Sequence, residues 1–207
     1  ASLDADQRLT PASLSKLFTA AVSLRQWGSN KTFTTRLLSD GKQEGELLKG
    51  SLTLVGGGDP GLVSEQLWEL VSQLQNKGIR RIEGDLVVDA SRFDRSECVT
   101  PDRCQARHRS RHAYNAGLSS AGINYGSWCV RVQPGERTGM PARAETCPFR
   151  IPEVTFKVDA LTVEKKGKAL QLERETGSGK GEVLRVRGQI GLGQAPVYLF
   201  VSAGDAS

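Results

Sequence analysis

Residues 51–91 carry the pattern that most constrains the fold of this chain. The strand-like run "SLTLV" leads into the glycine-rich loop "GGGDPG", then into the helical stretch "LVSEQLWELVSQLQNKGI" and the strand-like run "EGDLVVDAS". Within the helical stretch, four apolar residues share one face: Leu67, Leu70, Val71 and Leu74. A strand, a helix and a second strand in this order predict a parallel crossover.

The glycine-rich loop also matches a nucleotide-binding pattern. Gly56, Gly58 and Gly61 fit G-x-G-x-x-G, the dinucleotide-binding fingerprint, and a nucleotide-binding domain would be stabilised thermally by NAD or a nucleotide. Two residues argue against this function. Asp59 would place a carboxylate where a pyrophosphate must lie, and Pro60 removes a backbone N–H donor. We therefore interpret the loop as a tight structural turn.

Most of the remaining chain predicts further strands. The segment "FTTRLLSDGKQEGELLKGSLTLV" is divided by the turn pairs Asp40-Gly41 and Lys49-Gly50. An irregular, cysteine-bearing and Arg-rich section then extends to about residue 112. The β-rich remainder contains "SWCVRVQPG", "EVTFKVDALTVEKKG", "KALQLERE", "GEVLRVRGQI" and "APVYLFVSAG", and "GSGKGE" at residues 177–182 predicts a hairpin tip.

Composition and charge place the chain among packed globular proteins. Of its 207 residues, 38% are hydrophobic and 25% charged, which excludes a disordered or fibrous chain. The net charge of +5 is scattered except for clusters such as "RHRSRH" at residues 107–112, which we interpret as a solvated loop, so no nucleic-acid partner is expected. No run reaches the roughly 18 to 20 apolar residues of a membrane span, and no signal peptide opens the sequence.

Four cysteines form an even set without the C-x-x-C spacing of redox or zinc sites, and no metal or cofactor is expected. Pro101 and Asp102 are turn formers that would bring Cys98 and Cys104 together. We therefore predict the disulfides Cys98 with Cys104 and Cys129 with Cys147, which require an oxidising compartment such as a periplasm or the cell exterior. Four buried free thiols in a cytosolic protein are the alternative.

The opening stretch "TPASLSKLFTAA" predicts a helix with an unusual start. From Ala12 to Trp27, apolar residues recur at helical spacing, as expected for a helix that packs on a core. Pro11 suits the first helical position, Thr10 would cap the helix, and Gly28 would end it.

Ser13 and Lys16 are the candidate catalytic residues of this stretch. At positions i and i+3 their side chains share one helix face, whereas Ser15 points elsewhere. A serine hydroxyl becomes a nucleophile when a base takes its proton, and a lysine serves where its surroundings favour the neutral amine. Backbone N–H groups in a first helical turn lack intrahelical acceptors, so they can stabilise an oxyanion. The S-x-x-K spacing alone is weak evidence, because such tetrads arise by chance.

The wider sequence resembles a known enzyme family. The segments that carry the resemblance are "ASLDADQRLTPASLSKLFTAAVSLRQWG", "FTTRLL", "LKGSLTLVGGGDPGL", "IRRIEGDLVVDASRFD" and "AYNAGLSSAGINYGSWCVRVQPG". In order and content they resemble the three-domain, low-molecular-mass penicillin-binding proteins that are D-alanyl-D-alanine carboxypeptidases and endopeptidases. The resemblance implies an α/β opening segment of a penicillin-recognising serine transferase domain, followed by inserted mixed α/β and β-rich domains, so that the chain is α+β overall.

The resemblance also implies a function. Ser13 and Lys16 match the family's nucleophile and its lysine partner. The expected substrate is a peptidoglycan stem peptide ending in D-Ala-D-Ala, cleaved through an acyl-enzyme on Ser13. β-Lactam antibiotics are the expected covalent inhibitors, because their strained amide replaces the D-Ala-D-Ala bond. The expected location is periplasmic or secreted, and the rival function is a non-catalytic periplasmic protein of the same fold that binds peptidoglycan.

The chain departs from the family pattern in what it lacks. "GIN" at residues 122–124 mimics S-x-N without its serine, and "RTG" at residues 137–139 mimics K-T-G, but both lie inside the inserted region and we interpret them as structural. We expect residues 1–36 to be the first part of the catalytic domain, 37–150 a second domain and 151–207 a β-rich third domain. We expect the chain to be the first part of a longer enzyme. Taken alone, it would lack one oxyanion donor, and the loss of such a donor lowers the rate by about 10² to 10³.

Overall fold

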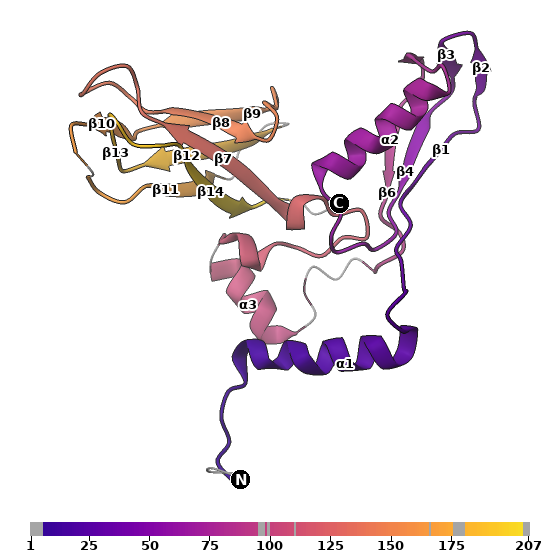
Figure 1. Ribbon diagram of the computed structural model, residues 1–207, viewed down its shortest axis with the longest axis horizontal. Coiled ribbons are helices and arrows are strands. Elements are labelled where there is room, and N and C mark those ends of the chain that lie inside the picture. The colour runs from indigo at the N-terminus through magenta and orange to yellow at the C-terminus, as the bar shows by residue number, and fades with distance from the viewer. Residues whose placement is uncertain are drawn as a thin grey trace. The chain divides into compact units, whose positions relative to one another are not determined.

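The computed structural model describes residues 6–94, 98, 100–109, 111–165, 167–175 and 181–204 (Figure 1). Contacts divide the chain into two compact units, residues 1–33 and 34–207. The first unit is helical, and the second combines small sheets with short helices, so the chain is of mixed α/β composition. None of the described helices is both long enough and apolar enough to cross a membrane.

The first unit contains the 3-10 helix η1 (Ala12–Leu14) and the α-helix α1 (Ser15–Trp27). The predicted Thr10 cap is wrong: Pro11 occupies the position before η1, and no side chain caps that end. Ala12 has a φ of 45°, outside the right-handed helical region, so the regular helix begins only at Ser15. The predicted end is confirmed, since Gly28 follows α1 with a φ of 73°, a conformation that glycine adopts at little cost.

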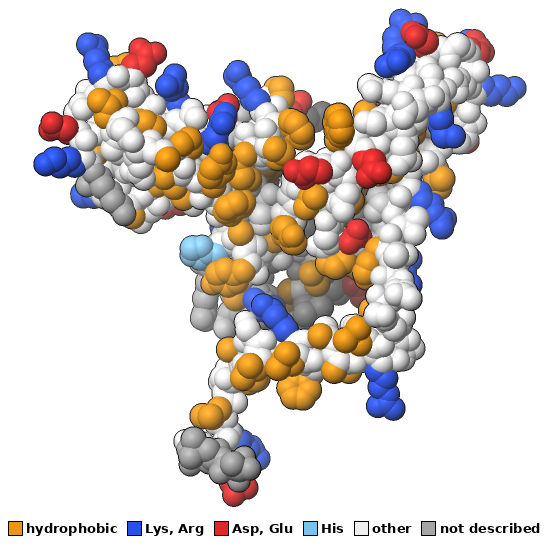
Figure 2. Space-filling model, in the orientation of Figure 1, with side chains coloured by type: hydrophobic (Ala, Val, Ile, Leu, Met, Phe, Trp, Pro, Cys, Tyr) orange, Lys and Arg blue, Asp and Glu red, His pale blue; other side chains and the backbone are white. Residues whose placement is uncertain are grey.

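The apolar stripe of α1 is exposed, whereas the sequence predicted that it packs on a core. Leu17 and Phe18 are 66% and 74% exposed, and Figure 2 shows hydrophobic side chains along this helix. The physical reason is that residues 6–33, the described part of the first unit, contain one α-helix and no second apolar layer, and a helix buries its stripe only against another element.

The predicted parallel crossover is confirmed in the second unit (Figure 1). Strand β4 pairs in parallel with β6, and helix α2 lies between them in the chain. The sheet orders are β1-β4-β6 and β2-β3-β5. Of the predicted turn pairs, Asp40-Gly41 falls between β1 and β2, whereas Lys49 is the last residue of β3 and Gly50 follows it. The bounds of these elements are β1 Arg36–Leu38, β2 Lys42–Glu44, β3 Leu47–Lys49, β4 Leu52–Val55, α2 Ser64–Asn76, β5 Arg81–Ile82 and β6 Leu86–Asp89.

The glycine-rich loop is a structural turn, as predicted. The Gly56 N–H donates to the Asp89 carbonyl, the Gly58 N–H to the Ser120 carbonyl, and the Gly61 N–H to the Asp59 side chain. A Cβ on Gly56 would lie 2.4 Å from the Ser120 oxygen, so this close approach requires glycine. Because the chain's own oxygens already accept these N–H groups, they are not left to bind a phosphate.

The section predicted to be irregular contains a helix, and this prediction is wrong. Helix α3 (Pro101–Arg109) follows Cys98, and the short helices η2 (Ala113–Asn115) and η3 (Asn124–Gly126) follow it. Pro101 opens α3 instead of forming a turn, because the first helical position requires no N–H donor. Both predicted disulfides are confirmed, and the Cα atoms are 5.4 Å apart in Cys98–Cys104 and 5.2 Å apart in Cys129–Cys147.

The β-rich remainder forms two three-stranded sheets, ordered β14-β7-β8 and β11-β12-β9, and a parallel pair, β10-β13. Their bounds are β7 Ser127–Gln133, β8 Arg143–Cys147, β9 Val154–Val158, β10 Leu161–Val163, β11 Gln171–Glu175, β12 Glu182–Arg187, β13 Gln189–Gly191 and β14 Val197–Ser202. Strand β8 was absent from the predicted strands. β11 and β12 are antiparallel neighbours, but residues 177–180 of the predicted hairpin tip lie outside the described residues.

Apolar side chains of the two three-stranded sheets share one core. Val130 and Val132 of β7 alternate with outward residues, as do Leu184 and Val186 of β12, and all four are fully buried. Val201 of β14 belongs to the same cluster. Side chains on the opposite face of sheet β14-β7-β8 therefore point away from this core.

Glu175 is expected to make folding stability depend on pH. Hydrogen bonds from Lys157 and Arg185 lower its pKa from the ordinary 4.5 to about 2. Between pH 4.5 and 2, Glu175 is protonated in the unfolded chain but still ionised in the folded chain. The stabilisation of the folded state by ionised Glu175 is therefore present above pH 4.5 and is lost as pH falls toward 2. In thermal unfolding between pH 7 and 2.5, Glu175→Gln should flatten the fall of the midpoint. Glu69→Gln, at an exposed position on α2, is the control, and an unchanged profile in Glu175→Gln would contradict the prediction.

Candidate functional site

Ser13 and Lys16 lie on one face of the helical segment in the first unit. Ser13 belongs to η1 and Lys16 to the first turn of α1. The Lys16 Nζ donates a hydrogen bond to the Ser13 Oγ at 3.5 Å, the outer limit of such a bond. Both side chains are exposed. The structure thus brings together the hydroxyl and the amine that the spacing predicts to share a face.

Ser15 is oriented differently from Ser13. Its Oγ donates to the backbone carbonyl of Ala12 at 2.8 Å, three residues earlier in the chain. This hydroxyl is therefore held against the backbone and does not face Lys16. Of the two serines beside the lysine, Ser13 is the one whose hydroxyl lies within hydrogen-bonding distance of the Lys16 amine.

The two look-alike motifs have structural roles, as predicted. Asn124 of "GIN" accepts the Ser64 N–H through Oδ1 at 3.1 Å and donates to the Ser64 hydroxyl through Nδ2 at 2.8 Å. It therefore serves the first turn of α2, whose N–H groups lack intrahelical partners. Within "RTG", the Gly139 N–H donates to the Thr162 carbonyl at 2.8 Å, which joins that loop to β10.

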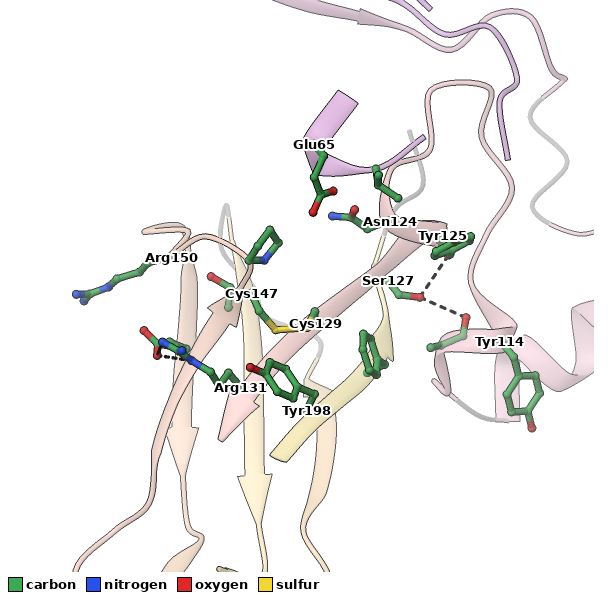
Figure 3. Close-up of a pocket in the computed structure, with 16 residues that line it drawn as sticks. Glu65, Tyr114, Asn124, Tyr125, Ser127, Cys129, Arg131, Cys147, Arg150 and Tyr198 are labelled. Carbon is green, nitrogen blue, oxygen red and sulfur yellow. Dashed lines mark hydrogen bonds and ion pairs between the residues drawn. A yellow bond between two sulfur atoms is a disulfide. The ribbon is translucent and has the colours of Figure 1, made fainter. Parts of the chain in front are cut away.

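A groove on the outer face of sheet β14-β7-β8 is a second candidate site (Figure 3). Its volume is about 730 Å³, within the usual range of ligand pockets. Alternate residues of all three strands point into it, while their neighbours enter the core. Those that form its floor are Cys129, Arg131, Glu145, Cys147, Tyr198 and Phe200.

Exposed aromatic rings line part of this groove. Tyr125, Tyr198 and Phe200 are 73%, 54% and 56% exposed. The chain has three tyrosines, and all three, including Tyr114, line the groove. A tyrosine ring offers an apolar face and a hydroxyl, so it suits a surface that contacts a ligand with both characters.

The backbone at Tyr125 is in a conformation that costs energy. Asn124, Tyr125 and Gly126 have φ values of 51°, 59° and 63°, all in the left-handed region. A non-glycine residue pays roughly 1–2 kcal/mol there. Bonds on either side hold the turn: the Asn124 N–H donates to the Leu62 carbonyl at 2.9 Å, and the Ala203 N–H donates to the Gly126 carbonyl at 2.8 Å. The structure thus maintains strain at the residue whose ring stands at the groove.

The charges that line the groove cancel. Arg131 and Glu145 form an ion pair across the floor, and the carboxylate raises the pKa of Arg131. Glu65 at the start of α2 and Arg150 after β8 carry the other two charges of the lining. Figure 3 shows Glu65 directed toward Asn124 and Arg150 directed away from the other labelled side chains. The described residues of the lining are therefore neutral in total, although the chain carries +5.

Sequence reasoning missed this groove. The run "VYLFVS" of β14 is apolar on both faces, so its alternation does not reveal which face is buried. The tyrosines could have indicated the groove, because the chain has three of them and two lie beside or within predicted strands.

Comparison with known protein families identifies the class of protein to which this chain belongs. Residues 1–206 match the D-Ala-D-Ala carboxypeptidase 3 (S13) family, and the chain belongs to this family.

Two curated relatives are named D-alanyl-D-alanine carboxypeptidases. The protein from Actinomadura sp. (strain R39) is 35% identical over 127 residues, which are 60% of this chain and 23% of the relative. DacB of Haemophilus influenzae is 42% identical over 82 residues, which are 40% of this chain and 17% of the relative. The matched regions thus span less than a quarter of the length of either relative.

Solved structures confirm the fold. Penicillin binding protein 4 (dacB) of Haemophilus influenzae matches 96% of this chain and 42% of its own, with a TM-score of 0.66 and 25% identity. The same protein in complex with a β-lactam matches 95% of this chain and 39% of its own, with a TM-score of 0.58 and 23% identity. The mixed α/β arrangement with several small sheets is therefore shared with these proteins.

Proposed function

We propose that this chain carries the nucleophile of a serine-type D-Ala-D-Ala carboxypeptidase or endopeptidase. The observation that supports the proposal is the Ser13 hydroxyl within 3.5 Å of the Lys16 amine, in a chain of the D-Ala-D-Ala carboxypeptidase 3 (S13) family. The substrate is a peptidoglycan stem peptide that ends in D-Ala-D-Ala. Activity is proposed for the full-length protein, since the chain spans less than half the length of the matched proteins.

In the proposed acylation step, the Ser13 Oγ attacks the carbonyl carbon of the penultimate D-alanine. Lys16 receives the hydroxyl proton as the oxygen–carbon bond forms. The peptide C–N bond then breaks, and the proton passes to the leaving amine of the terminal D-alanine. The remaining peptide is held as an ester on Ser13.

In the proposed deacylation step, a water molecule attacks the ester carbon and loses a proton to the same amine. The bond between carbon and the Ser13 oxygen breaks, and the proton returns to that oxygen. For an endopeptidase, the leaving amine belongs to a cross-linked neighbouring peptide, and the sequence of bond changes is otherwise the same.

The surroundings of Ser13 support completion of the site by further residues. Ser13 and Lys16 are exposed, whereas electrostatic stabilisation of an oxyanion is strongest where water is excluded. We propose that residues 1–36 contribute the first part of a catalytic domain that sequence outside this chain completes. The boundaries at residues 36 and 150 stay a prediction. The two disulfides support a periplasmic or secreted location.

Labelling with a penicillin tests the proposed function. The full-length protein is incubated with a fluorescent penicillin, digested and mapped by mass spectrometry. We expect one covalent adduct with the mass of the intact penicillin, on the peptide that contains Ser13, because opening of the β-lactam ring leaves no departing group. A protein that binds peptidoglycan without forming an adduct would instead be the non-catalytic rival, and an adduct on another serine would refute the assignment.

A further inference from the structure

The groove on sheet β14-β7-β8 has no part in the proposed reaction, yet it is built as a ligand site. Its floor belongs to a single sheet, where Tyr198 lies opposite Arg131 and Phe200 opposite Cys129. Both rings therefore stand side by side along one strand, separated by one inward residue. On the same face, the Cys129–Cys147 disulfide joins β7 to β8 and so restrains the sheet that carries the rings.

The left-handed turn at η3 adds a third ring to this floor. Tyr125 precedes β7 by two residues, and the Ser127 hydroxyl donates to its carbonyl at 3.3 Å (Figure 3). The ring is more exposed than either ring of β14, although its backbone conformation is costly. Strain retained at an exposed aromatic residue is expected where the ring serves a binding function.

The chemistry of the groove selects the class of ligand. Two carboxylates and two guanidinium groups cancel, and Arg131 and Glu145 are already paired with each other. A polyanion would find no net attraction here, and a strongly charged peptide would find none either. Exposed rings with hydroxyl groups at their edges instead suit a neutral ligand that has apolar C–H faces and many polar substituents.

We propose that this groove binds the glycan strand of peptidoglycan, through stacking of its amino-sugar rings on Tyr125, Tyr198 and Phe200. The choice of ligand rests on the proposed function, because the stem peptides of the proposed substrate are attached to a neutral β-linked glycan backbone. The groove is open along the sheet face, so it accommodates part of a polymer. Its role is to hold the strand, and the bond cleavage proposed for Ser13 is a separate event.

Binding of peptide-free glycan tests the proposal. A β-linked oligomer of N-acetylglucosamine, which is a neutral amino-sugar chain, is titrated calorimetrically into the full-length protein, because glycan released by an amidase would carry free lactyl carboxylates. Tyr125→Ala and Phe200→Ala should each weaken binding about 3- to 10-fold, and the double variant about 10- to 100-fold. Trp68→Ala is the matched control, because Trp68 is 68% exposed on α2 and lies outside the groove lining, and its affinity should equal that of the wild type.

A second measurement requires no substitution. Because all three tyrosines line the groove, saturating glycan should slow their nitration by tetranitromethane in the wild-type protein, with Tyr125 and Tyr198 resolved by mass spectrometry. Wild-type affinity in the double variant, together with unprotected tyrosines, would overturn the proposal. A groove-dependent affinity for a synthetic stem peptide but not for the glycan would also overturn it.

The two proposals fail independently of each other. Ser13→Ala should retain the glycan affinity, because Ser13 is not part of the groove. Penicillin labelling without groove-dependent glycan binding would refute the proposed glycan site but not the proposed reaction. Glycan binding without penicillin labelling would refute the proposed reaction but not the proposed glycan site.

Discussion

Ser13→Ala is expected to abolish covalent labelling of the full-length protein by penicillin. In the proposed mechanism the acyl bond forms only on the Ser13 oxygen, and loss of the nucleophile in serine hydrolases lowers kcat on the order of 10⁶-fold. The same variant should show no release of D-alanine from a stem pentapeptide above the uncatalysed rate. Labelling is measured by fluorescence after gel electrophoresis, and D-alanine by a coupled oxidase assay.

Ser15→Ala is the matched control for this experiment. Ser15 lies two residues from Ser13, but its hydroxyl bonds to the Ala12 carbonyl and does not face Lys16. Its replacement should leave labelling close to that of the wild type. Persistent labelling of Ser13→Ala, or loss of labelling only in Ser15→Ala, would show that the nucleophile has been misassigned.

Lys16→Met is expected to slow acylation about 10²- to 10⁴-fold, the usual contribution of general acid–base catalysis. The Lys16 amine is the group within 3.5 Å of the Ser13 oxygen, and methionine has similar length but cannot accept the proton. The rate is measured as the second-order constant for penicillin acylation by stopped-flow fluorescence. Lys31→Met, a substitution at another exposed lysine of the first unit, is the control.

Lys16→Arg separates proton transfer from simple attraction of charge. Arginine retains a positive charge and can donate to the Ser13 hydroxyl, but a guanidinium does not release its proton in proteins. If Lys16 is the base, the arginine variant should be about as slow as the methionine variant. Recovery of most of the wild-type rate in Lys16→Arg would show that the lysine acts only through its charge.

Several features could be predicted because they depend on residues close together in the chain. Ser13 and Lys16 share a face because they are three residues apart in a helical segment. The parallel pairing of β4 with β6 follows from the order of strand, glycine loop, helix and strand. The Cys98–Cys104 disulfide was also predicted from local spacing, although the helix α3 that begins at Pro101 was mistaken for a turn.

Other features could not be predicted, because weak local patterns were decided by distant partners. Helix α3 has many charged residues and no apolar stripe, so no hydrophobic periodicity predicted a helix there. Strand β8 has the sequence "RAETC", and it becomes a strand through its pairing with β7, where Cys129 lies opposite Cys147. The exposed stripe of α1 shows the reverse case, since this strong local pattern has no packing partner among the described residues of its own unit.

The sequence by itself determined the order of the elements and the pairing of a hydroxyl with an amine at the start of the chain, because helical and strand periodicities act over a few residues. Only the tertiary structure decided that β14 pairs with β7, about seventy residues earlier, and that Tyr198 and Phe200 face outward beside Tyr125. The reason is that a strand with apolar residues on both faces is oriented by the sheet that it joins. The groove therefore exists only in the folded chain.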